Sequence, residues 1–315
     1  MNLRHLRAFA AIADAGGVAR AAAHLHLSQP AISRQIQALE AELGVRLFDR
    51  IGRRVQLTTE GGDLLRRSRR LLAEAESLGE HARSLKAGES GILRLGATPQ
   101  VIENLLADFL SQYRRRHSGV EVQLVEDGGV SVQARLERGE LDLAATTEGT
   151  HFHDQPLYPM HLVAVISPGH RLSRGASLEI AELTDEPLLL LKRGFGSREW
   201  FDLACETANV RPRVLLESAA PHTLVALAST DYGVAILPSN ARVPAGSVNA
   251  RPLVHRGASL GRWQCIAWDP RRFLAPYAER FIAEITSHCR RGFPGQDLIR
   301  RAPPLPRPKN SAKLR

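Results

Sequence analysis

Apolar residues recur at helical spacing through the first part of the chain and predict three helices. An apolar stripe within residues 3–13 predicts the first helix, and an alanine-rich run over 18–24 predicts the second. In the third, apolar side chains follow steps of four, three and four residues, at Ile32, Ile36, Leu39 and Leu43. Ser28 is placed to cap this third helix, Pro30 fits its first turn, and Gly44 ends it.

The second and third helices are joined by a tight apolar turn over 25–27, which is typical of a helix-turn-helix. Pro30 lies near the start of the later helix, whose outer face carries side chains that can pair with base edges in the major groove: Gln29, Ser33, Arg34 and Gln37. This pattern favours DNA recognition. The alternative is an amphipathic core helix whose polar face is only solvated.

A basic hairpin is predicted next, over residues 46–57, with Gly52 in its turn. Arg50, Arg53 and Arg54 gather there and suit a phosphate backbone or a minor groove. Beside a recognition helix, such a hairpin is typical of a wing. The alternative is a solvated turn that carries arginine.

A seam with alternating steps of four and three residues runs through 60–86 and predicts one long helix. Its positions are Leu64, Ser68, Leu71, Ala75, Leu78, Ala82 and Leu85. At about 1.5 Å per residue the helix is roughly 40 Å long. One copy cannot bury this seam alone, so we expect the helix to pair with a second copy and to hold two DNA-binding heads at a set separation.

The period changes after residue 90, where short apolar runs alternate with helical stretches and predict an α/β domain built on a parallel sheet. The predicted strands are 92–95, 120–125, 141–145, 162–166, 188–191, 214–216, 234–237 and 264–268. The predicted helices are 99–116, 130–138, 178–183, 197–208, 221–229 and 274–289.

The formal charge of +9 is concentrated at the two ends of the chain. Residues 1–88 carry a net +5, residues 89–292 a net −1, and residues 293–315 a net +5. A basic N-terminal module on a neutral body indicates local contact with a polyanion. With no signal peptide pattern and no apolar run long enough to span a membrane, we expect a soluble cytoplasmic protein.

The N-terminal region contains the stretch AAAHLHLSQPAISRQIQALEAELGVRLFDR, which is followed by VQLTTEG. In this stretch the chain resembles the LysR-type transcriptional regulators, and the resemblance covers roughly residues 1–65. The family's usual Thr-Pro-Ala-Gly appears here as Thr58-Thr59-Glu60-Gly61, in which Thr58 can still cap the next helix.

This resemblance implies a winged helix-turn-helix DNA-binding domain over 1–59, a dimerising linker helix over 60–89 and a two-lobed α/β effector domain over 90–292. The effector domain would be similar to type 2 periplasmic binding proteins, with lobe 1 at 90–160 plus 264–292 and lobe 2 at 161–263. We expect residues 293–315, which include PPLPRPK, to be a basic disordered tail.

The same resemblance implies a regulator, not an enzyme, that binds double-stranded promoter DNA and a small-molecule effector. It implies a homodimer or a homotetramer built as a dimer of dimers, and RNA polymerase is a further candidate partner. We expect no metal, no cofactor and no membrane partner. The rival interpretation is an α/β solute-binding or enzymatic domain without DNA function.

An effector cleft is expected beyond the carboxyl ends of the strands, at helix N-termini. The candidate residues are Thr98, Pro99, Gln100, Gly128, Gly129, Val130, Thr146, Lys192, Arg193, Arg198, Pro221, His222 and Thr223. The basic cluster around Arg198 leads to the hypothesis of an anionic effector, such as a carboxylate, held by Thr98, Arg198 and the helix N-termini. The alternative is that these are surface charges on an exposed loop.

Two further patterns could indicate a metal site and a redox pair, but each favours a structural role without a ligand. His151, His153 and Asp154 could hold a metal, but an H-x-H on a loop more often has no ligand. Cys205 and Cys265 could form a redox pair, as in some peroxide-sensing relatives. Nothing basic surrounds Cys205 in the sequence, which favours a buried structural thiol.

Overall fold

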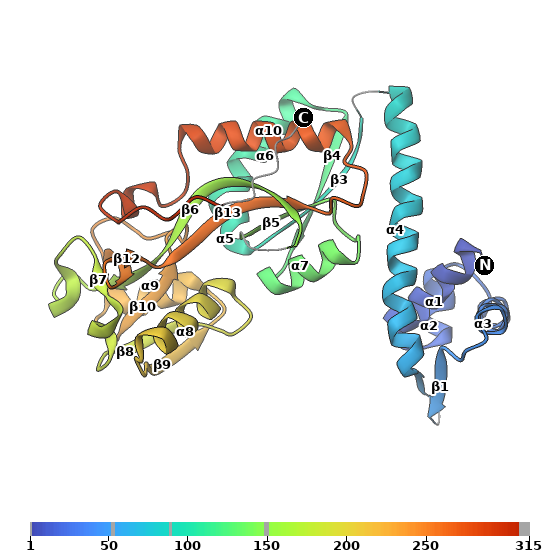
Figure 1. Cartoon of the computed structure of the whole chain (residues 1–315), viewed down its shortest axis with the longest axis horizontal. Helices are drawn as coiled ribbons and strands as arrows, with labels where there is room; N and C mark the ends of the chain where they lie inside the picture. Colours follow the sequence, from blue (N-terminus) through green and yellow to red (C-terminus); the bar gives the residue numbers. More distant parts are fainter. Residues whose placement is uncertain (1, 52–53, 88–89, 148–150, 309–315) are drawn as a thin grey trace. The chain divides into compact units, whose positions relative to one another are not determined.

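A computed structural model describes residues 2–51, 54–87, 90–147 and 151–308 (Figure 1). The chain divides into two compact units, with the boundary near Leu85. Within the described residues, no helix combines the length and the apolar character that crossing a membrane requires.

The N-terminal unit is a small helical domain with a two-stranded hairpin and one long helix (Figure 1). Its elements are α1 (Leu3–Ala15), α2 (Val18–His24), α3 (Gln29–Leu43), β1 (Phe48–Ile51), β2 (Arg54–Leu57) and α4 (Thr59–Ala87). The predicted caps are confirmed: the Ala31 N–H donates to Ser28 Oγ at 3.3 Å, and Gly44 ends α3 at φ 71°. Leu65, near the start of α4, is buried in the core that α1, α2 and α3 form, so the first turns of the long helix belong to this domain.

Three side chains or backbone positions join α3, the hairpin and α4. Glu40 on α3 accepts from the Leu47 N–H at 2.8 Å, immediately before the hairpin. Thr58 caps α4, because its Oγ1 accepts from the Gly61 N–H at 2.8 Å. Gly61 is required by space, since a Cβ there would lie 2.2 Å from the Leu47 carbonyl oxygen. These contacts fix where the hairpin emerges relative to the recognition helix.

The second unit is an α/β domain whose strands form one extended sheet. The strands are β3 (Gly91–Ala97), β4 (Val120–Glu126), β5 (Leu143–Thr147), β6 (His153–Ile166), β7 (Leu178–Glu179), β8 (Pro187–Leu191), β9 (Arg213–Ser218), β10 (Val234–Pro238), β11 (Asn249–His255), β12 (Ala258–Ser259) and β13 (Gly261–Trp268). The helices are α5 (Pro99–Val101), a π-helical segment (Ile102–Leu106), α6 (Ala107–Arg116), α7 (Gly129–Glu137), α8 (Gly196–Ala208), α9 (Pro221–Ser229) and α10 (Pro276–Arg291).

Two long strands, β6 and β13, connect two lobes with separate cores. The strand order β4-β3-β5-β13-β6-β10-β8-β9 places β13 and β6 at the centre. Residues 153–161 of β6 pair with β13, and residues 162–165 pair with β10. One core includes Leu93, Phe109 and Phe281, and the other includes Leu162, Leu188 and Phe201. The two-lobed α/β prediction is confirmed.

The prediction of a wholly parallel sheet is wrong, because the central strands are antiparallel. β6 runs antiparallel to β13 and to β10, while β3 with β5 and β8 with β10 are parallel pairs. The predicted helix at 178–183 is also wrong. That stretch is the short strand β7 followed by one 3-10 turn, Ile180–Leu183. Two strands, β11 and β12, were not predicted at all.

The prediction of a disordered C-terminal tail is wrong for residues 293–308, and residues 309–315 lie outside the described part. The Phe293 ring stacks on Tyr158 with centroids 5.2 Å apart. Leu305 is buried, and the Trp263 Nε1–H donates to the Pro306 carbonyl oxygen at 2.9 Å. The proline-rich composition hid these anchors, since an extended segment needs only a few apolar contacts and hydrogen bonds to dock.

Candidate DNA-binding surface and effector cavity

The outer face of α3 presents the side chains that the sequence nominates for base contact. Ile32, Ile36 and Leu39 are buried against the domain core. On the opposite face, Ser33 is half-buried, and the other candidates are exposed: Gln29, Pro30, Arg34 and Gln37. This face is therefore free to enter a DNA groove. The buried apolar residues of α3 fix the rotation of the helix and so decide which side chains point outward.

The hairpin has the form of a wing. β1 and β2 pair antiparallel, with Arg50 opposite Val55 and Arg54 opposite Ile51. Arg53 lies outside the described residues. The pairing register places Arg50 and Arg54 at the end of the hairpin where the chain passes from β1 to β2.

The seam of α4 is partly exposed in the single chain. Leu64 is half-buried against the N-terminal core. Leu71 is 47% exposed and Leu78 is 69% exposed, with the half-buried Ala75 between them. The side chain of Leu85 lies outside the described part. Two exposed leucines seven residues apart on one helix face are a surface that a second helix can cover.

A cavity of about 120 Å³ lies between the two lobes of the second unit. Five predicted residues line it: Thr98, Gln100, Gly129, Val130 and Thr146. The remaining candidates are not part of its lining: Pro99, Gly128, Lys192, Arg193, Arg198, Pro221, His222 and Thr223. The loop after β3, the start of α7 and the end of β5 thus contribute, whereas the basic cluster does not.

Arg198 is a structural residue of the second lobe, which corrects its predicted role in holding a ligand. Its side chain is buried and donates to Asp202 Oδ1 and to the Leu191 carbonyl oxygen, each at 2.8 Å, and it also pairs with Glu217. Burial by itself would lower the pKa of Arg198, but the carboxylates of Glu217 and Asp202 outweigh it and raise that pKa. Arg198 in turn lowers the pKa of Glu217. The guanidinium charge is therefore neutralised within its own lobe.

The sequence did not point to several residues that line the cavity from within helices and strands. These are Gln133 on α7, Glu199 and Trp200 on α8, Asn240 after β10, and Gln264 on β13. The amide groups of Gln133 and Gln264 both donate to Thr146, to its Oγ1 and its carbonyl oxygen respectively, each at 2.7 Å. These residues are far apart in the sequence, and no local sequence pattern indicates that their side chains meet at one cavity.

The two lobes are linked beside the cavity by a side chain of the π-helical segment. Asn104 Nδ2 donates to the Gln100 and Asn240 carbonyl oxygens, at 3.0 Å each. Gln100 belongs to the first lobe, and Asn240 follows β10 of the second. π-helical turns often mark functional positions, because the extra residue re-aims side chains. Asn104 thus joins the lobes through two residues that line the cavity.

An outer groove of about 650 Å³ adjoins the cavity and shares several of its residues, including Val130 and Trp200. The guanidinium of Arg262 lies over the Trp200 ring, 5.9 Å from its centroid. The exposed Leu203 adds an apolar wall. A ligand can therefore extend from the cavity along an aromatic surface.

The cysteines are buried thiols in this arrangement. Cys205, Cys265 and Cys289 are all free and buried. Burial raises the pKa of Cys205 to about 12, so the thiol stays protonated at neutral pH.

Within the described residues no cluster of three metal-ligating side chains occurs around His151, His153 or elsewhere.

Two family models match the chain and together cover most of it. The bacterial regulatory helix-turn-helix model of the lysR family matches residues 3–62, and the LysR substrate binding domain matches residues 86–290. The chain belongs to the LysR family of bacterial transcriptional regulators.

Two relatives match this chain over most of its length. The uncharacterized HTH-type transcriptional regulator YnfL of Escherichia coli (strain K12) is 31% identical over 297 residues, 92% of this chain and 99% of the relative. The regulator AlsR of Bacillus subtilis (strain 168) is 29% identical over 77% of this chain and 82% of its own.

Among solved structures, a full-length OxyR variant from Pseudomonas aeruginosa is similar with a TM-score of 0.69 and 26% identity. The match covers 92% of this chain and 95% of that one. Full-length CbnR in a complex with its target DNA has the same fold, with a TM-score of 0.60 and 24% identity over 92% and 99% of the two chains. The chain is therefore a DNA-binding transcriptional regulator with an effector-binding domain.

Proposed function

We propose that the exposed face of α3 reads promoter sequence in the major groove. The observation that carries this proposal is the division of α3 into a buried apolar stripe and an outer face bearing Gln29, Arg34 and Gln37. Arg matches guanine O6 and N7, and Gln matches adenine N6 and N7. Ser33 and Pro30 complete the surface that enters the groove.

The wing supplies affinity that does not depend on sequence. Arg50, Arg53 and Arg54 neutralise phosphates or enter the adjacent minor groove, and each released counterion adds to the salt dependence of binding. Because the contacts of Glu40 and Thr58 fix the hairpin beside α3, wing and recognition helix engage one stretch of DNA together.

Two copies pair through α4, which we infer from the exposed Leu71 and Leu78. The seam also includes Leu64 before these leucines, Ala75 between them and Leu85 after them. A pair of DNA-binding domains then recognises two half-sites, and two such dimers assemble as a tetramer. The regulator works in the cytoplasm, has no catalytic activity of its own, and acts on transcription through RNA polymerase.

The cavity between the lobes holds the small-molecule effector. A ligand bound there contacts the loops of both lobes at once, so it favours one relative orientation of the lobes over others. The changed orientation alters how the DNA-binding heads of the assembly are placed, and so how the DNA is bent.

A footprinting titration of the full chain on the DNA upstream of its own gene tests the proposal. Two protected half-sites, separated by about 34 Å or a multiple of it along the duplex, are expected for a dimer. The rival solute-binding or enzymatic interpretation predicts no protection beyond that on unrelated DNA. Uniform protection without half-sites at any protein concentration would contradict base reading by α3.

A further inference from the structure

The sequence led us to expect a positively charged effector cavity, but the lining of the cavity carries a negative charge. This inference rests on the proposed function, in which the cavity holds the effector. Of the lining residues that the structure describes, Glu199 alone carries a formal charge. Lys192 and Arg193 are exposed outside the lining, and Arg198 is paired internally with Asp202 and Glu217. No described cation is thus present in the lining to balance a carboxylate ligand.

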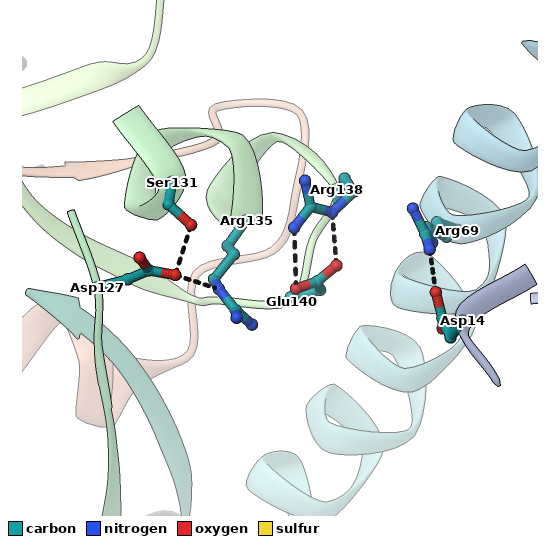
Figure 2. A network of polar contacts seen from close by, with 7 residues as sticks. All are labelled: Asp14, Arg69, Asp127, Ser131, Arg135, Arg138 and Glu140. Atoms are coloured by element: carbon teal, nitrogen blue, oxygen red, sulfur yellow. Dashed lines mark hydrogen bonds and ion pairs between the residues drawn. The ribbon is translucent and has the colours of Figure 1, made fainter. Parts of the chain in front are cut away.

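Helix N-termini at the cavity also have acidic side chains of their own. α7 begins next to Asp127, whose carboxylate accepts from the Gly128 N–H at 2.8 Å. The same carboxylate accepts from the Ser131 hydroxyl and from Arg135 Nε, the latter at 3.3 Å (Figure 2). The hydrogen bond from Ser131, above all, lowers the pKa of Asp127, which stays ionised. The first turn of α8 contains Glu199. Glu199 therefore partly offsets the positive end of the α8 dipole, which weakens its attraction of an anion, whereas the Asp127 carboxylate is already paired with Arg135.

The hydrogen bonds of the lining amides use one N–H of Gln133, one N–H of Asn240 and both N–H groups of Gln264. They leave the side-chain oxygens of all three without a donor among the described residues. Gln264 donates to the Thr146 carbonyl oxygen, a group that can only accept, so the orientation of its amide is set by chemistry. Gln133 donates to Thr146 Oγ1, and Asn240 donates to the Tyr158 hydroxyl at 3.5 Å. The side-chain oxygens of Gln133, Asn240 and Gln264 remain as acceptors.

Two buried amide atoms at the cavity have no partner among the described residues. Asn240 Oδ1 lacks a donor, and Gln100 Nε2 lacks an acceptor. Asn240 is 3% exposed and Gln100 is 5% exposed, so solvent does not compensate either group. An unpaired buried polar group costs about 1–3 kcal/mol. A ligand that offers a donor to one and an acceptor to the other recovers this free energy.

We propose that the effector is an uncharged or cationic molecule that donates hydrogen bonds and carries an apolar body, and that it is not a simple carboxylate. A primary amide or a related neutral group supplies donors for the oxygens of Asn240, Gln133 and Gln264, and an acceptor for Gln100. The apolar body lies against Trp200. An amine places its charge near Glu199. A carboxylate would place its negative charge near Glu199, with no described cation in the lining to balance it.

Matched compounds on one ring test this inference by calorimetry with the full chain. The probes are benzoate, benzamide and benzylamine, together with indole-3-acetate, indole-3-acetamide and tryptamine. We expect the amide of each set to bind at least about tenfold more tightly than the carboxylate, because the carboxylate charge lies near Glu199 without a described lining cation to balance it. Glu199→Gln should weaken the amines more than the amides.

A blocking variant locates the binding. Val130 lines the cavity and is 53% exposed, so Val130→Trp fills the entrance without disturbing the core. It should abolish amide binding, whereas Leu215→Trp, at an exposed position on β9, should not. The inference is overturned if carboxylates bind more tightly than amides in the parent chain, or if Val130→Trp leaves amide binding intact. It is also overturned if no amide or amine binds at millimolar concentration.

These outcomes are separate from those of the proposed regulatory function. Tight carboxylate binding that Val130→Trp abolishes would refute the ligand class and leave an effector cavity in place. The DNA-protection experiment is independent of any ligand, so its failure would refute DNA reading alone.

Discussion

The exposed seam of α4 allows the free energy of dimerisation to be anticipated. Leu71 is 47% exposed and Leu78 is 69% exposed in the single chain. Full burial of a leucine side chain is worth about 1.5–3 kcal/mol. Covering these two surfaces in both chains of a dimer therefore contributes roughly 3–7 kcal/mol. Replacement of both leucines by alanine removes most of that contribution.

We expect Leu71→Ala with Leu78→Ala to raise the dimer dissociation constant by about 30- to 5000-fold, corresponding to about 2–5 kcal/mol. Sedimentation equilibrium over a wide concentration range measures this constant. Leu203→Ala is the matched control, because Leu203 is a 56% exposed leucine on α8 of the other unit. The helical content by circular dichroism should stay constant in all three proteins.

The dimerisation argument fails if the double variant and the parent chain have the same dissociation constant. It also fails if Leu203→Ala weakens the dimer as much as the double substitution does. In either case the exposed leucines of α4 are not the contact surface, and the two DNA-binding domains are held together elsewhere.

Three further outcomes are expected. Gly61→Ala should lower the stability of the N-terminal unit by about 1–3 kcal/mol, because its Cβ would lie 2.2 Å from the Leu47 carbonyl oxygen. Gly62→Ala, with open space at its Cβ, should raise that stability by about 0.5–1 kcal/mol, and equal melting shifts would refute the packing argument. Burial lowers the pKa of His161 from 6.5 to about 4. Between these values the unfolded chain binds the extra proton, so stability is full above pH 6.5 and falls by about 3 kcal/mol toward pH 4. Urea unfolding should lose this slope in His161→Gln, and an unchanged slope would exclude His161 as its source. Arg53→Ala should reduce the salt slope of DNA binding by about one unit on every sequence, and an unchanged slope would refute the wing assignment.

The local signals in the sequence predicted the N-terminal domain well, because each helix there has its own cap and apolar stripe. Ser28 and Gly44 mark the two ends of α3, and the structure places both in those roles. The contact between Glu40 and the Leu47 N–H could not be predicted in the same way. It joins the recognition helix to a hairpin through a backbone group, which leaves no residue pattern.

The effector domain was predicted less completely, because its central feature is non-local. β6 is a 14-residue strand that contains Pro156 and Pro159, and these prolines mask the strand pattern of its first half. Its partner β13 comes about a hundred residues later, so neither the crossover nor its antiparallel direction has a local signature. The short strand β12 has only two residues, too few for any periodicity.

The residues of the candidate site were likewise predicted where a local signal exists and missed where the contact is non-local. Thr98, which follows β3, and Thr146, near the carboxyl end of β5, were found because the carboxyl ends of strands mark ligand sites in such sheets. Arg198 was misassigned because charge alone suggested a ligand. The spacing of Arg198 and Asp202, four residues apart on one helix, was the available sign of an internal ion pair. Gln264 lies within a strand and becomes part of the cavity only through the crossover.

The central claim, that α3 reads sequence while the wing supplies general affinity, is tested most directly by a ratio of two dissociation constants. Fluorescence anisotropy gives the affinity of the full chain for its own upstream DNA and for a shuffled duplex of equal composition at one salt concentration. Gln29→Ala should reduce this ratio by about 5- to 150-fold, equivalent to about 1–3 kcal/mol, without changing the affinity for shuffled DNA. An unchanged ratio, or an equal loss of affinity for both duplexes, would contradict the account.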